Sequence, residues 1–463
     1  MSSTFYSKFY STHVEIDIAS GAIMSRDIVP YEGPWEGAMG LETATATAIL
    51  KTVYEGDLKE QINQDTTALK YIVDGDMTGK KWEGAKVVVA LHTKRNSGVK
   101  AIALNTGQIP QAGNQGTANA EINMKKWFGH IQLTADIMAQ AKTNKGAFVN
   151  ALTMEQEGMV NDISRQRNRG LNYFGQGTLA VVSAGANSAT QAIKDPGNVV
   201  GTVNPERFIK VGDVIAITSS DGTVLRGVQT VLSITTPNVV FDAAINTTTG
   251  DLLSFGSNSV APGESSFNAE PIGLLGLIDS TTYVSNAYTI DRSLAANAFW
   301  RSNVLTSVGS LNPDLLNRAI QNNHEISGKK IKKMYTHYGV AREILKLTEQ
   351  DKRYNVQPGN KGSSFQAGPE DEEFGFGGKD GTADRDAPYG TLFMFPEDGY
   401  LERYELGESG WAEEDGNLFL RAQFYDQYEA RYRLREQFFN SRPNAFTRLD
   451  GITNTVSSGA FGL

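Results

Sequence analysis

The sequence predicts an α+β fold in which a long β hairpin leads directly into a long helix. Three patterns support this prediction. Strand-like alternation runs through Ala118–Leu133, helical spacing of apolar residues starts at Gly146, and strand patterns dominate both 203–256 and the last hundred residues. The 463 residues, 40% hydrophobic and 21% charged, suffice for two or three domains with cores of their own.

The hairpin is predicted from an outgoing arm and the turn that follows it. Lys86–His92 and Gly98–Leu104 form this arm, because both stretches are rich in β-branched and aliphatic residues and are bounded by glycine. The joining stretch, 105–116, is rich in glycine and glutamine and has little apolar surface to bury. We therefore expect this tip to be mobile or to wait for a partner.

The return arm alternates with the period of two that is typical of a half-buried strand. Its apolar positions share one face up to Met124 and change parity at Lys125-Lys126, which a single β-bulge would explain. The two sets are Ala118, Ala120, Ile122 and Met124, then Trp127, Gly129, Ile131 and Leu133. Because so long a ribbon exposes its edges, we expect it to lie on its own chain or on a neighbouring copy.

Four further segments are predicted from their composition and periodicity. Residues 1–40 indicate an extended arm, and the alanine-rich stretch 41–62 favours a helix. The long helix runs from Gly146 to the glycines of Phe174-Gly-Gln-Gly177. Short helices are predicted over Asn312–Ile326, with proline at its first helical position, and over Val340–Thr348.

Residues 203–256 predict a small β-barrel or sandwich inserted before the later helices. Its expected strands are Val214–Ile217, Gly227–Ile234 and Asn238–Phe241, which are separated by Asp-Gly and Thr-Pro turns. The glycine-rich, acidic stretch 355–390 is interpreted as a loop.

The C-terminal region returns to strands. Leu418–Tyr425 alternates, and Tyr428–Arg435 predicts an unusually long strand that ends at Arg442-Pro443, before a final short strand. One face of the long strand carries Glu429, Arg431, Arg433 and Arg435. We expect these arginines to pair with carboxylates of an adjacent copy or of the chain's own acidic loop, and contact with packaged nucleic acid is the alternative.

Composition excludes several classes of protein. No run of about 18 apolar residues exists, which excludes a membrane-spanning helix. The first residues lack the apolar core of a secretion signal, so we expect action in the compartment of synthesis. Absence of cysteine excludes disulfides and thiolate chemistry. The net charge of −9 argues against a protein that grips nucleic acid over a broad surface.

No motif predicts a catalytic residue, a cofactor site or a metal site. The histidines are scattered without zinc-ligand spacing, and the glycines near residue 377 neither follow a strand nor open a helix as a phosphate loop would. Three aspartates lack the spacing of a calcium loop and indicate a solvated acidic turn. The residues considered were His13, His92, His130, His324 and His337; Gly375, Gly377, Gly378 and Gly381; and Asp380, Asp384 and Asp386.

The order of these parts resembles the major capsid protein of tailed bacteriophages, the Hong Kong 97-type capsid fold. An arm, a long hairpin, a long helix, a central α/β region and a C-terminal strand follow one another as in that family. Local likenesses cover nearly the whole chain: Phe174-Gly-Gln-Gly-Thr178, Pro271–Ile278, Ile290-Asp-Arg292, Phe299-Trp300, His337–Glu343 and Arg442-Pro-Asn-Ala-Phe446.

The resemblance implies a division of the chain into named parts. These are an N-terminal arm at 1–40, the first part of the P-domain at 41–76, an E-loop at 77–135, a spine helix of the P-domain at 136–177, an A-domain at 178–384 with the β module at 203–256, and C-terminal P-domain strands at 385–463. No scaffold-like segment precedes the arm, which suggests a separate scaffolding protein. Some relatives crosslink lysine to asparagine; Lys94, Lys100 and Asn444 are available, without a motif match.

The resemblance also implies a function. The chain would assemble with itself into hexamers and pentamers of an icosahedral virion shell, built in the host cytoplasm, that encloses double-stranded DNA without reading its sequence. Scaffolding, portal and decoration proteins are the further expected partners, and no membrane is involved. Three alternatives stay open: an encapsulin shell that encloses enzymes, a β-rich carbohydrate-active enzyme with an Asp/Glu pair, and a phage decoration or tail protein.

Overall fold

The computed structural model describes the chain in several stretches that cover most of its length. These are residues 2–6, 13–17, 67–74, 81–83, 86–104, 107–134, 145–197, 205–256, 267–349, 373–406, 410–412, 420–421 and 425–453. The predicted helix at 41–62, most of the arm at 1–40 and the acidic stretch 355–372 lie outside the described residues, as does most of the predicted strand Leu418–Tyr425.

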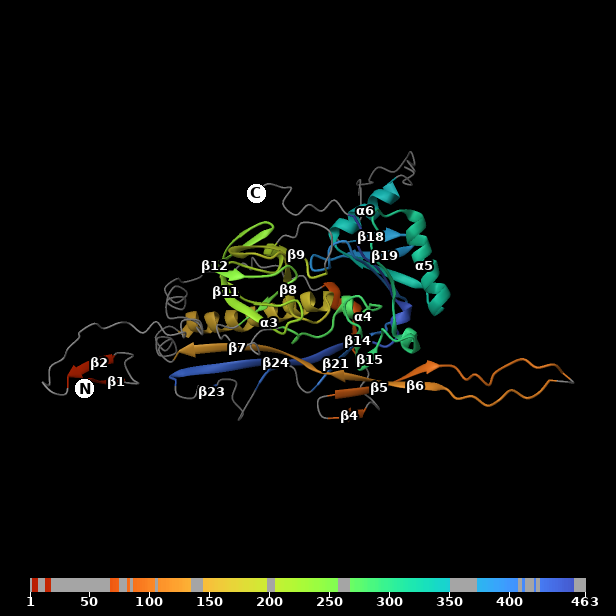
Figure 1. The fold of residues 1–463 in the computed structure, drawn as a ribbon, viewed down its shortest axis with the longest axis horizontal. Coiled ribbons are helices and arrows are strands. Elements are labelled where there is room, and N and C mark those ends of the chain that lie inside the picture. Colours follow the sequence, from red (N-terminus) through yellow and green to blue (C-terminus); the bar gives the residue numbers. More distant parts are fainter. Residues whose placement is uncertain are drawn as a thin grey trace.

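A long sheet, antiparallel except for the parallel pair of β3 and β21, forms one side of the body (Figure 1). Its central strand β24 pairs over ten residues with β7, from Gln427 opposite Thr134 to Glu436 opposite Lys125. The predicted long C-terminal strand is therefore confirmed, and it ends at Asn440, just before the predicted end at Arg442-Pro443. The strands of this sheet are β3 (Val73–Asp74), β7 (Lys125–Thr134), β21 (Leu401–Glu405), β22 (Gly410–Trp411), β23 (Leu420–Arg421) and β24 (Gln427–Asn440).

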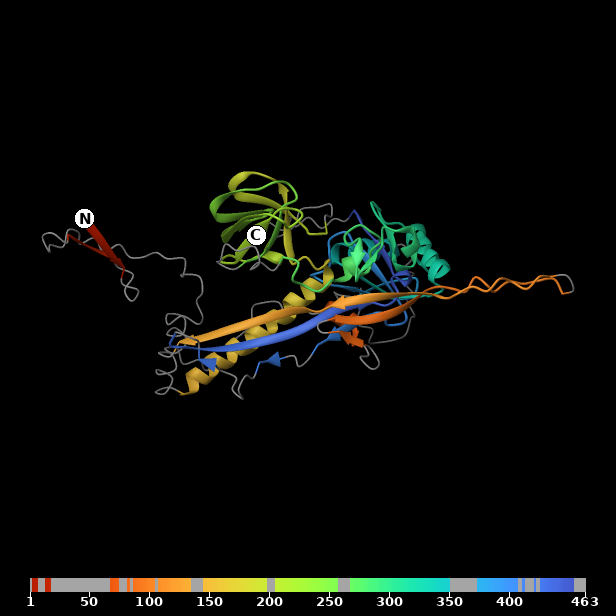
Figure 2. The same cartoon turned by 60° about the horizontal axis from the view of Figure 1, so that its bottom comes forward.

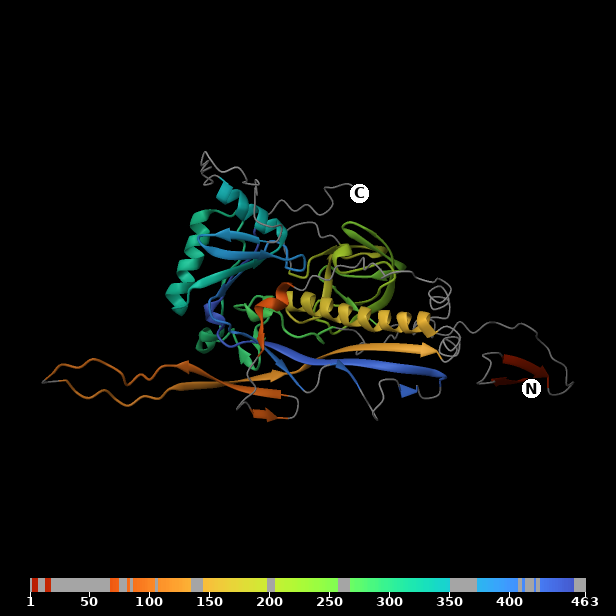
Figure 3. The same ribbon diagram turned by 180° about the vertical axis from the view of Figure 1, so that it is seen from behind.

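The 28-residue helix α3 (Lys145–Asn172) lies along one face of β7 and β24 (Figures 1 and 3). Ile131, Leu133 and Ala430 pack beneath it, together with Met159. Gly129 lets the helix approach the sheet, because a Cβ there would overlap the Met159 sulfur. The predicted long helix is thus confirmed, and it ends two residues before the predicted glycine exit.

The hairpin is a three-stranded sheet of β4 (Lys81–Glu83), β5 (Lys86–Lys94) and β6 (Gly116–Asn123). The predicted change of parity at Lys125 is confirmed, but its cause is not a bulge. β6 pairs with β5, whereas β7 pairs with β24, so the chain changes sheets at Met124. Prediction of a strand over Gly98–Leu104 is wrong: both arms continue beyond β5 and β6 without strand pairing (Figure 2).

A closed barrel lies beside α3 (Figure 1). The prediction at 203–256 was too short, because the first two strands follow the long helix directly and the barrel begins at Thr178. Around the barrel the order is β10 (Val214–Thr218), β11 (Leu225–Thr235), β12 (Asn238–Asn246), β9 (Asn187–Lys194), β8 (Thr178–Ala184) and β13 (Leu252–Phe255). Its interior is a separate apolar cluster around Ile215, Ile217 and Phe241.

A second six-stranded sheet completes the body together with two helices. Both predicted helices are confirmed, and Asn312 caps α5 by accepting a hydrogen bond from the Leu315 amide at 2.8 Å. In sheet order the strands are β16 (Asn303–Leu305), β25 (Thr447–Leu449), β20 (Leu392–Pro396), β17 (Ile331–Thr336), β19 (Lys379–Ala383) and β18 (Glu373–Phe376); the helices are α5 (Pro313–Ser327) and α6 (Tyr338–Glu349).

Part of the stretch interpreted as a loop is a β hairpin. β18 and β19 are joined by Gly377 and Gly378, whose φ values of 57° and 73° fit the two-residue turn that glycine favours. The prediction of a loop over 355–390 is therefore wrong for Glu373–Ala383, where the glycine-rich, acidic composition concealed two strands.

The principal core lies between the two large sheets and is rich in aromatic residues, among them Trp300, Tyr335, Phe393, Phe438, Phe439 and Phe446. Short elements line it: α4 (Leu274–Leu277), β14 (Asn286–Ala287), β15 (Ile290–Asp291) and the 3-10 helices η1 (Thr67–Tyr71), η2 (Pro205–Arg207), η4 (Ala295–Trp300) and η5 (Pro443–Ala445). Away from this body, β1 (Ser2–Tyr6) pairs with β2 (His13–Asp17).

Candidate assembly interface

The base of the ribbon is fixed to the body. Val87, Ala120 and Ile122 are completely buried in the principal core. The Glu121 amide donates to the Tyr288 carbonyl at 3.1 Å, and Gln437 of β24 donates to the Asn123 carbonyl at 3.2 Å. The ribbon therefore leaves the body from a rigid position.

A groove of about 500 Å³ opens beside this base. Asn268, Tyr288 and Thr289 line it and have φ values of 54°, 56° and 69°. Such left-handed backbone is costly for residues other than glycine, so the surrounding contacts must hold it in place. The Tyr288 hydroxyl supplies one of these contacts by donating to the Phe438 carbonyl.

The outer part of the ribbon exposes aliphatic side chains. The exposed fractions are 83% for Val99, 97% for Leu104 and 83% for Ile109, and Ile102 is half exposed. Three of these residues precede the glycine-rich stretch 105–116, and Ile109 is the one large aliphatic residue within it, so the apolar surface of the ribbon lies mainly before the tip. Exposed apolar groups gathered at the end of a projection are typical of surfaces that another protein covers.

The face of the β7/β24 pair that points away from α3 is basic. Arg431, Arg433 and Arg435 stand there opposite His130, Phe128 and Lys126 of β7. We call the four cations Lys126, Arg431, Arg433 and Arg435 the outer basic face. Burial, and then the charges of Arg433, Arg435 and Arg431, lower the pKa of Lys126. The predicted charged face is thus confirmed as a cluster of like charges.

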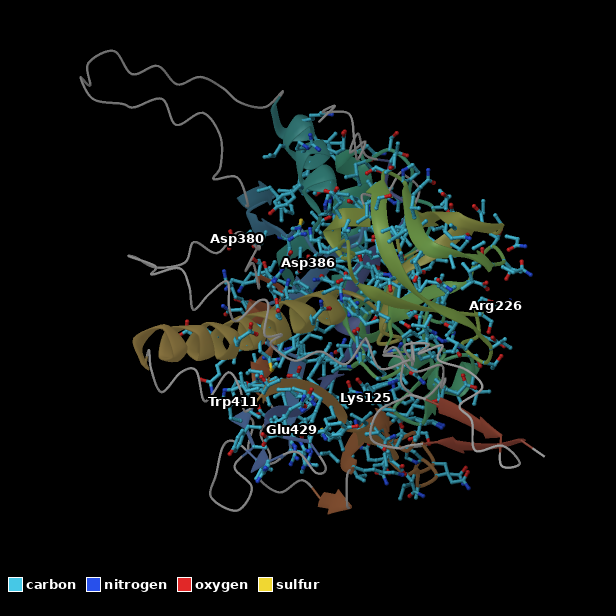
Figure 4. All side chains as sticks on the ribbon, turned by 90° about the vertical axis from the view of Figure 1, so that its left-hand side faces the viewer. Lys125, Arg226, Asp380, Asp386, Trp411 and Glu429 are labelled. Atoms are coloured by element: carbon cyan, nitrogen blue, oxygen red, sulfur yellow. The ribbon has the colours of Figure 1, made fainter. Side chains whose placement is uncertain are left out.

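One carboxylate of the same face, Glu429, partly compensates this charge. Glu429 accepts a hydrogen bond from Arg431 at 2.9 Å and lies 3.4 Å from the His130 ring nitrogen. Burial opposes ionisation of Glu429, but the hydrogen bond from Arg431 and the neighbouring charges lower its pKa overall. Arg431 thus pairs with a carboxylate of its own strand, whereas pairing with the acidic loop or with an adjacent copy stays a prediction. Figure 4 shows Glu429 and Trp411 on the sheet side of α3.

A buried polar cluster joins the barrel to the body. Arg207 pairs with Asp195 at 3.3 Å and donates to the Ala387 carbonyl at 2.6 Å, while its guanidinium stacks on Tyr389. Burial raises the pKa of Asp195 and that of Tyr173, which donates to Asp195. No pattern in the sequence predicts this cluster, because its members come from separate segments of no unusual composition.

The histidines considered from the sequence stay apart. His92 lies within 2.6 Å of Gln115 across the ribbon, His324 lies on the exposed side of α5, and His13 belongs to β2. His337 is buried against the Tyr389 ring. No group of three His, Asp or Glu residues suited to a metal ion occurs among the described residues.

The three aspartates are not a solvated acidic turn. Asp384 is completely buried and accepts from the Tyr335 hydroxyl at 2.7 Å, and Asp386 accepts from Asn168 of α3 at 2.9 Å. Asp380 is exposed on β19. The pair Asp384 and Asp386 thus fastens the second sheet to α3. Figure 4 shows Asp386 on the side of the helix opposite the β7/β24 sheet.

The lysines and the asparagine named for crosslinking lie in different parts of the chain. Lys94 and Lys100 are exposed on the ribbon, whereas the Asn444 carbonyl in η5 accepts from Asn303 at 3.2 Å. Among the described residues, no helix is long and apolar enough to cross a membrane.

Comparison with known proteins is informative only at the level of structure. No protein-family model and no curated protein matches this sequence. A chain of the capsid asymmetric unit of cyanophage A-1(L) aligns over 89% of this chain and 99% of its own, with a TM-score of 0.51 and 9% identity.

Two further capsid structures are similar at lower scores. A chain from the capsid of a native GTA particle covers 89% of this chain and 98% of its own, with a TM-score of 0.45 and 8% identity. A chain from the capsid of Myoviridae phage XM1 covers 86% and 100%, with a TM-score of 0.41 and 8% identity. The match to the cyanophage chain over nearly its whole length shows that this protein has a phage capsid fold.

Proposed function

We propose that the protein is the major capsid protein of a tailed double-stranded DNA bacteriophage. Copies assemble as hexamers and pentamers into an icosahedral shell that encloses the genome. The fold shared with the cyanophage capsid chain supports this proposal, and so do the projecting ribbon and the hairpin β1–β2, which joins no larger sheet among the described strands. The role is structural rather than enzymatic.

The exposed aliphatic side chains of the ribbon carry the proposal. In the single chain, Val99, Leu104 and Ile109 remain almost entirely in water, although the base of the same ribbon is buried. Burying a Val, Leu or Ile side chain contributes about 1.5–3 kcal/mol, so a surface of a neighbouring copy that covers all three would gain several times this amount. Repeating that contact around a symmetry axis produces a closed assembly.

In this proposal the parts of the chain keep the names that the family uses. Residues 77–135 form the E-loop, 136–177 the spine helix, and 178–384 the A-domain that meets its equivalents near the symmetry axes. Residues 41–76 and 385–463 complete the P-domain, and 1–40 form the arm. The shell assembles in the host cytoplasm, and scaffolding, portal and decoration proteins are its further partners. A net charge of −9 suits a container that must release its DNA.

Electron microscopy of two matched triple variants tests the proposal. V99D/L104D/I109D places charges on the ribbon, and V211D/V224D/L232D places the same charges on exposed positions of the barrel, where the exposed fractions are 64%, 50% and 56%. We expect the first variant to give soluble, folded subunits and at least about tenfold fewer particles, since about 1.4 kcal/mol per contact already changes an equilibrium tenfold. The barrel variant should assemble like the wild type.

Two outcomes would contradict the proposal. Normal shells from the ribbon variant would show that the ribbon does not join subunits. A wild-type protein that stays monomeric under all assembly conditions would remove the capsid function altogether. Extraction of particles from infected cells separates the encapsulin alternative, because that shell would contain an enzyme in place of double-stranded DNA.

A further inference from the structure

A groove of about 690 Å³ lies between helix α5 and strand β16. The helix stands at the margin of the body (Figures 1 and 3). Residues 301–305 line one wall of this groove, which we call the α5 groove. The helix supplies the other wall with Leu315, Arg318, Ala319, Gln321, Asn322 and Glu325. Because most of these positions recur at intervals of three and four, they form one stripe along the helix.

Strand β16 leaves its outer edge unpaired among the described strands, because it is the last strand of its sheet. Its Asn303 amide donates to the Phe446 carbonyl at 3.0 Å. Its Leu305 carbonyl accepts from the Asp450 amide at 2.8 Å. Polar groups of successive residues alternate between the two sides of a strand, so those of Val304 point away from the sheet. Free edges of this kind are usually covered by another element.

A buried hydroxyl in the groove also lacks a partner. Ser302 lines the groove and is only 6% exposed, yet its Oγ atom has no hydrogen-bond partner among the described residues. Such an unsatisfied group costs about 1–3 kcal/mol. A polar side chain that enters the groove from another molecule would remove this cost.

The charges of the groove are open to a partner. Arg318 and Glu325 are exposed, and neither forms an ion pair with another residue that the structure describes. The third charged group, Arg301, donates to the carbonyls of Arg292 and Ser293. Arg318 and Glu325 are seven residues apart, which is about two turns or 10.5 Å along the same face of the helix.

We propose that the α5 groove is the docking surface for α5 of a second copy. The two helices lie antiparallel, related by a two-fold axis that passes between Gln321 and Asn322. This arrangement places Arg318 of each copy opposite Glu325 of the other, so the same patch is complementary to itself. The pairing forms between free subunits and goes beyond the proposed shell, because it needs neither the ribbon nor a closed assembly.

Other occupants match the groove less well. A ribbon from a neighbour would satisfy Glu325 but would bring a further positive charge to Arg318, because between Gly84 and Ala120 the sequence has no aspartate or glutamate. Its charged residues there are Lys86, Lys94, Arg95 and Lys100. Nucleic acid would meet the carboxylate of Glu325 at the same surface. A second α5 supplies both signs of charge at the required spacing.

A cysteine near the two-fold axis tests the docking, because the natural chain contains no cysteine. We expect free subunits of the variant N322C to give a covalent dimer on a non-reducing gel after oxidation. The matched control N317C carries its thiol at an exposed position of the same helix that does not line the groove. This control should give at least about tenfold less dimer, since a disulfide needs the two Cα atoms within about 7 Å.

Charge reversal in the N322C background tests the antiparallel register. R318E and E325R each replace both attractive contacts by repulsive ones, so each should lower the dimer yield at least about tenfold, which requires only about 1.4 kcal/mol. When the two variants are mixed, two acidic side chains of one copy meet two basic side chains of the other. The mixed dimer, identified by an affinity tag on one variant, should therefore return to the yield of the N322C parent.

Two results would overturn the inference. Equal dimer yields from N322C and N317C would show that the α5 groove does not pair copies. A mixed dimer that stays as scarce as the dimers of R318E and E325R alone would show that the charges do not face each other across a two-fold axis. Because the measurement uses free subunits only, a failure to form shells would contradict the proposed function without changing this result.

Discussion

The barrel and the ribbon both extend from the body, but the barrel buries its apolar side chains whereas the outer ribbon exposes them. In the barrel, Ile217, Val239 and Phe241 are no more than 1% exposed, and closure of the sheet leaves no free strand edge. On the ribbon, Leu104 is 97% exposed, and the arms beyond β5 and β6 lack strand pairing. The barrel is complete within one chain, whereas the ribbon needs another surface.

This difference separates stability from assembly. A substitution inside the barrel should change the stability of the single subunit, since the barrel side chains already pack against one another within one chain. A substitution at the end of the ribbon should change only association, since we expect the ribbon side chains to be buried only when subunits assemble. The two regions therefore predict opposite results in two separate measurements.

Truncation of one large side chain in each region gives the largest contrast. Phe241→Ala should lower the free energy of unfolding by about 3–5 kcal/mol, because it leaves a cavity inside the barrel. Leu104→Ala should change it by less than about 0.5 kcal/mol. Chemical denaturation of unassembled subunits measures both values. Similar losses of stability in the two variants would mean that the ribbon is packed in the subunit.

A smaller, pH-dependent effect is expected where the barrel joins the body. Burial, followed by the charges of Arg207 and Arg342, lowers the pKa of His337 well below its usual value. The Nδ1 atom of His337 also accepts from the Gly339 amide at 3.3 Å, which requires an unprotonated nitrogen. The folded state therefore disfavours protonation of His337. The contribution of neutral His337 to the free energy of unfolding is complete above the unfolded pKa of about 6.5, and it is lost as the pH falls below that value.

The unfolding free energy should therefore fall below pH 6.5 with a slope of at most about 1.4 kcal/mol per pH unit from this group. His337→Gln should flatten the slope, whereas the control His324→Gln, at an exposed position of α5, should preserve it. An unchanged slope in the His337 variant would show that this side chain takes no part in the acid response.

Patterns within one strand or helix allowed most of the architecture to be predicted. The change of parity at Lys125 was visible in the sequence, and so were the α5 start at Asn312-Pro313 and the basic positions of β24. The cause of this change could not be predicted from the sequence. β6 pairs with β5 in the hairpin, whereas the next strand, β7, pairs with β24, which lies some three hundred residues later in the chain. Alternation within a strand shows which residues share a face of the sheet, but it does not show which strand pairs with it.

The incorrect predictions have related physical causes. Gly98–Leu104 has strand-forming residues, yet strands need pairing, and the glycines of the opposite arm offer little side-chain surface to hold them. Asp384 looked solvated because acidic residues usually are, but Tyr335 and the α3 asparagine Asn168 satisfy it in the interior. Tertiary partners that compensate a buried charge cannot be found from composition.

Hydrogen exchange of the ribbon amides, measured in isolated subunits and in assembled particles, tests the central claim most directly. We expect the stretches 95–104 and 107–115 to exchange rapidly in the subunit and to become strongly protected on assembly, while β10 and β13 of the barrel exchange equally slowly in both states. Ribbon amides that exchange at the same rate in the two states would contradict the account, because the ribbon would then lie on no neighbouring copy.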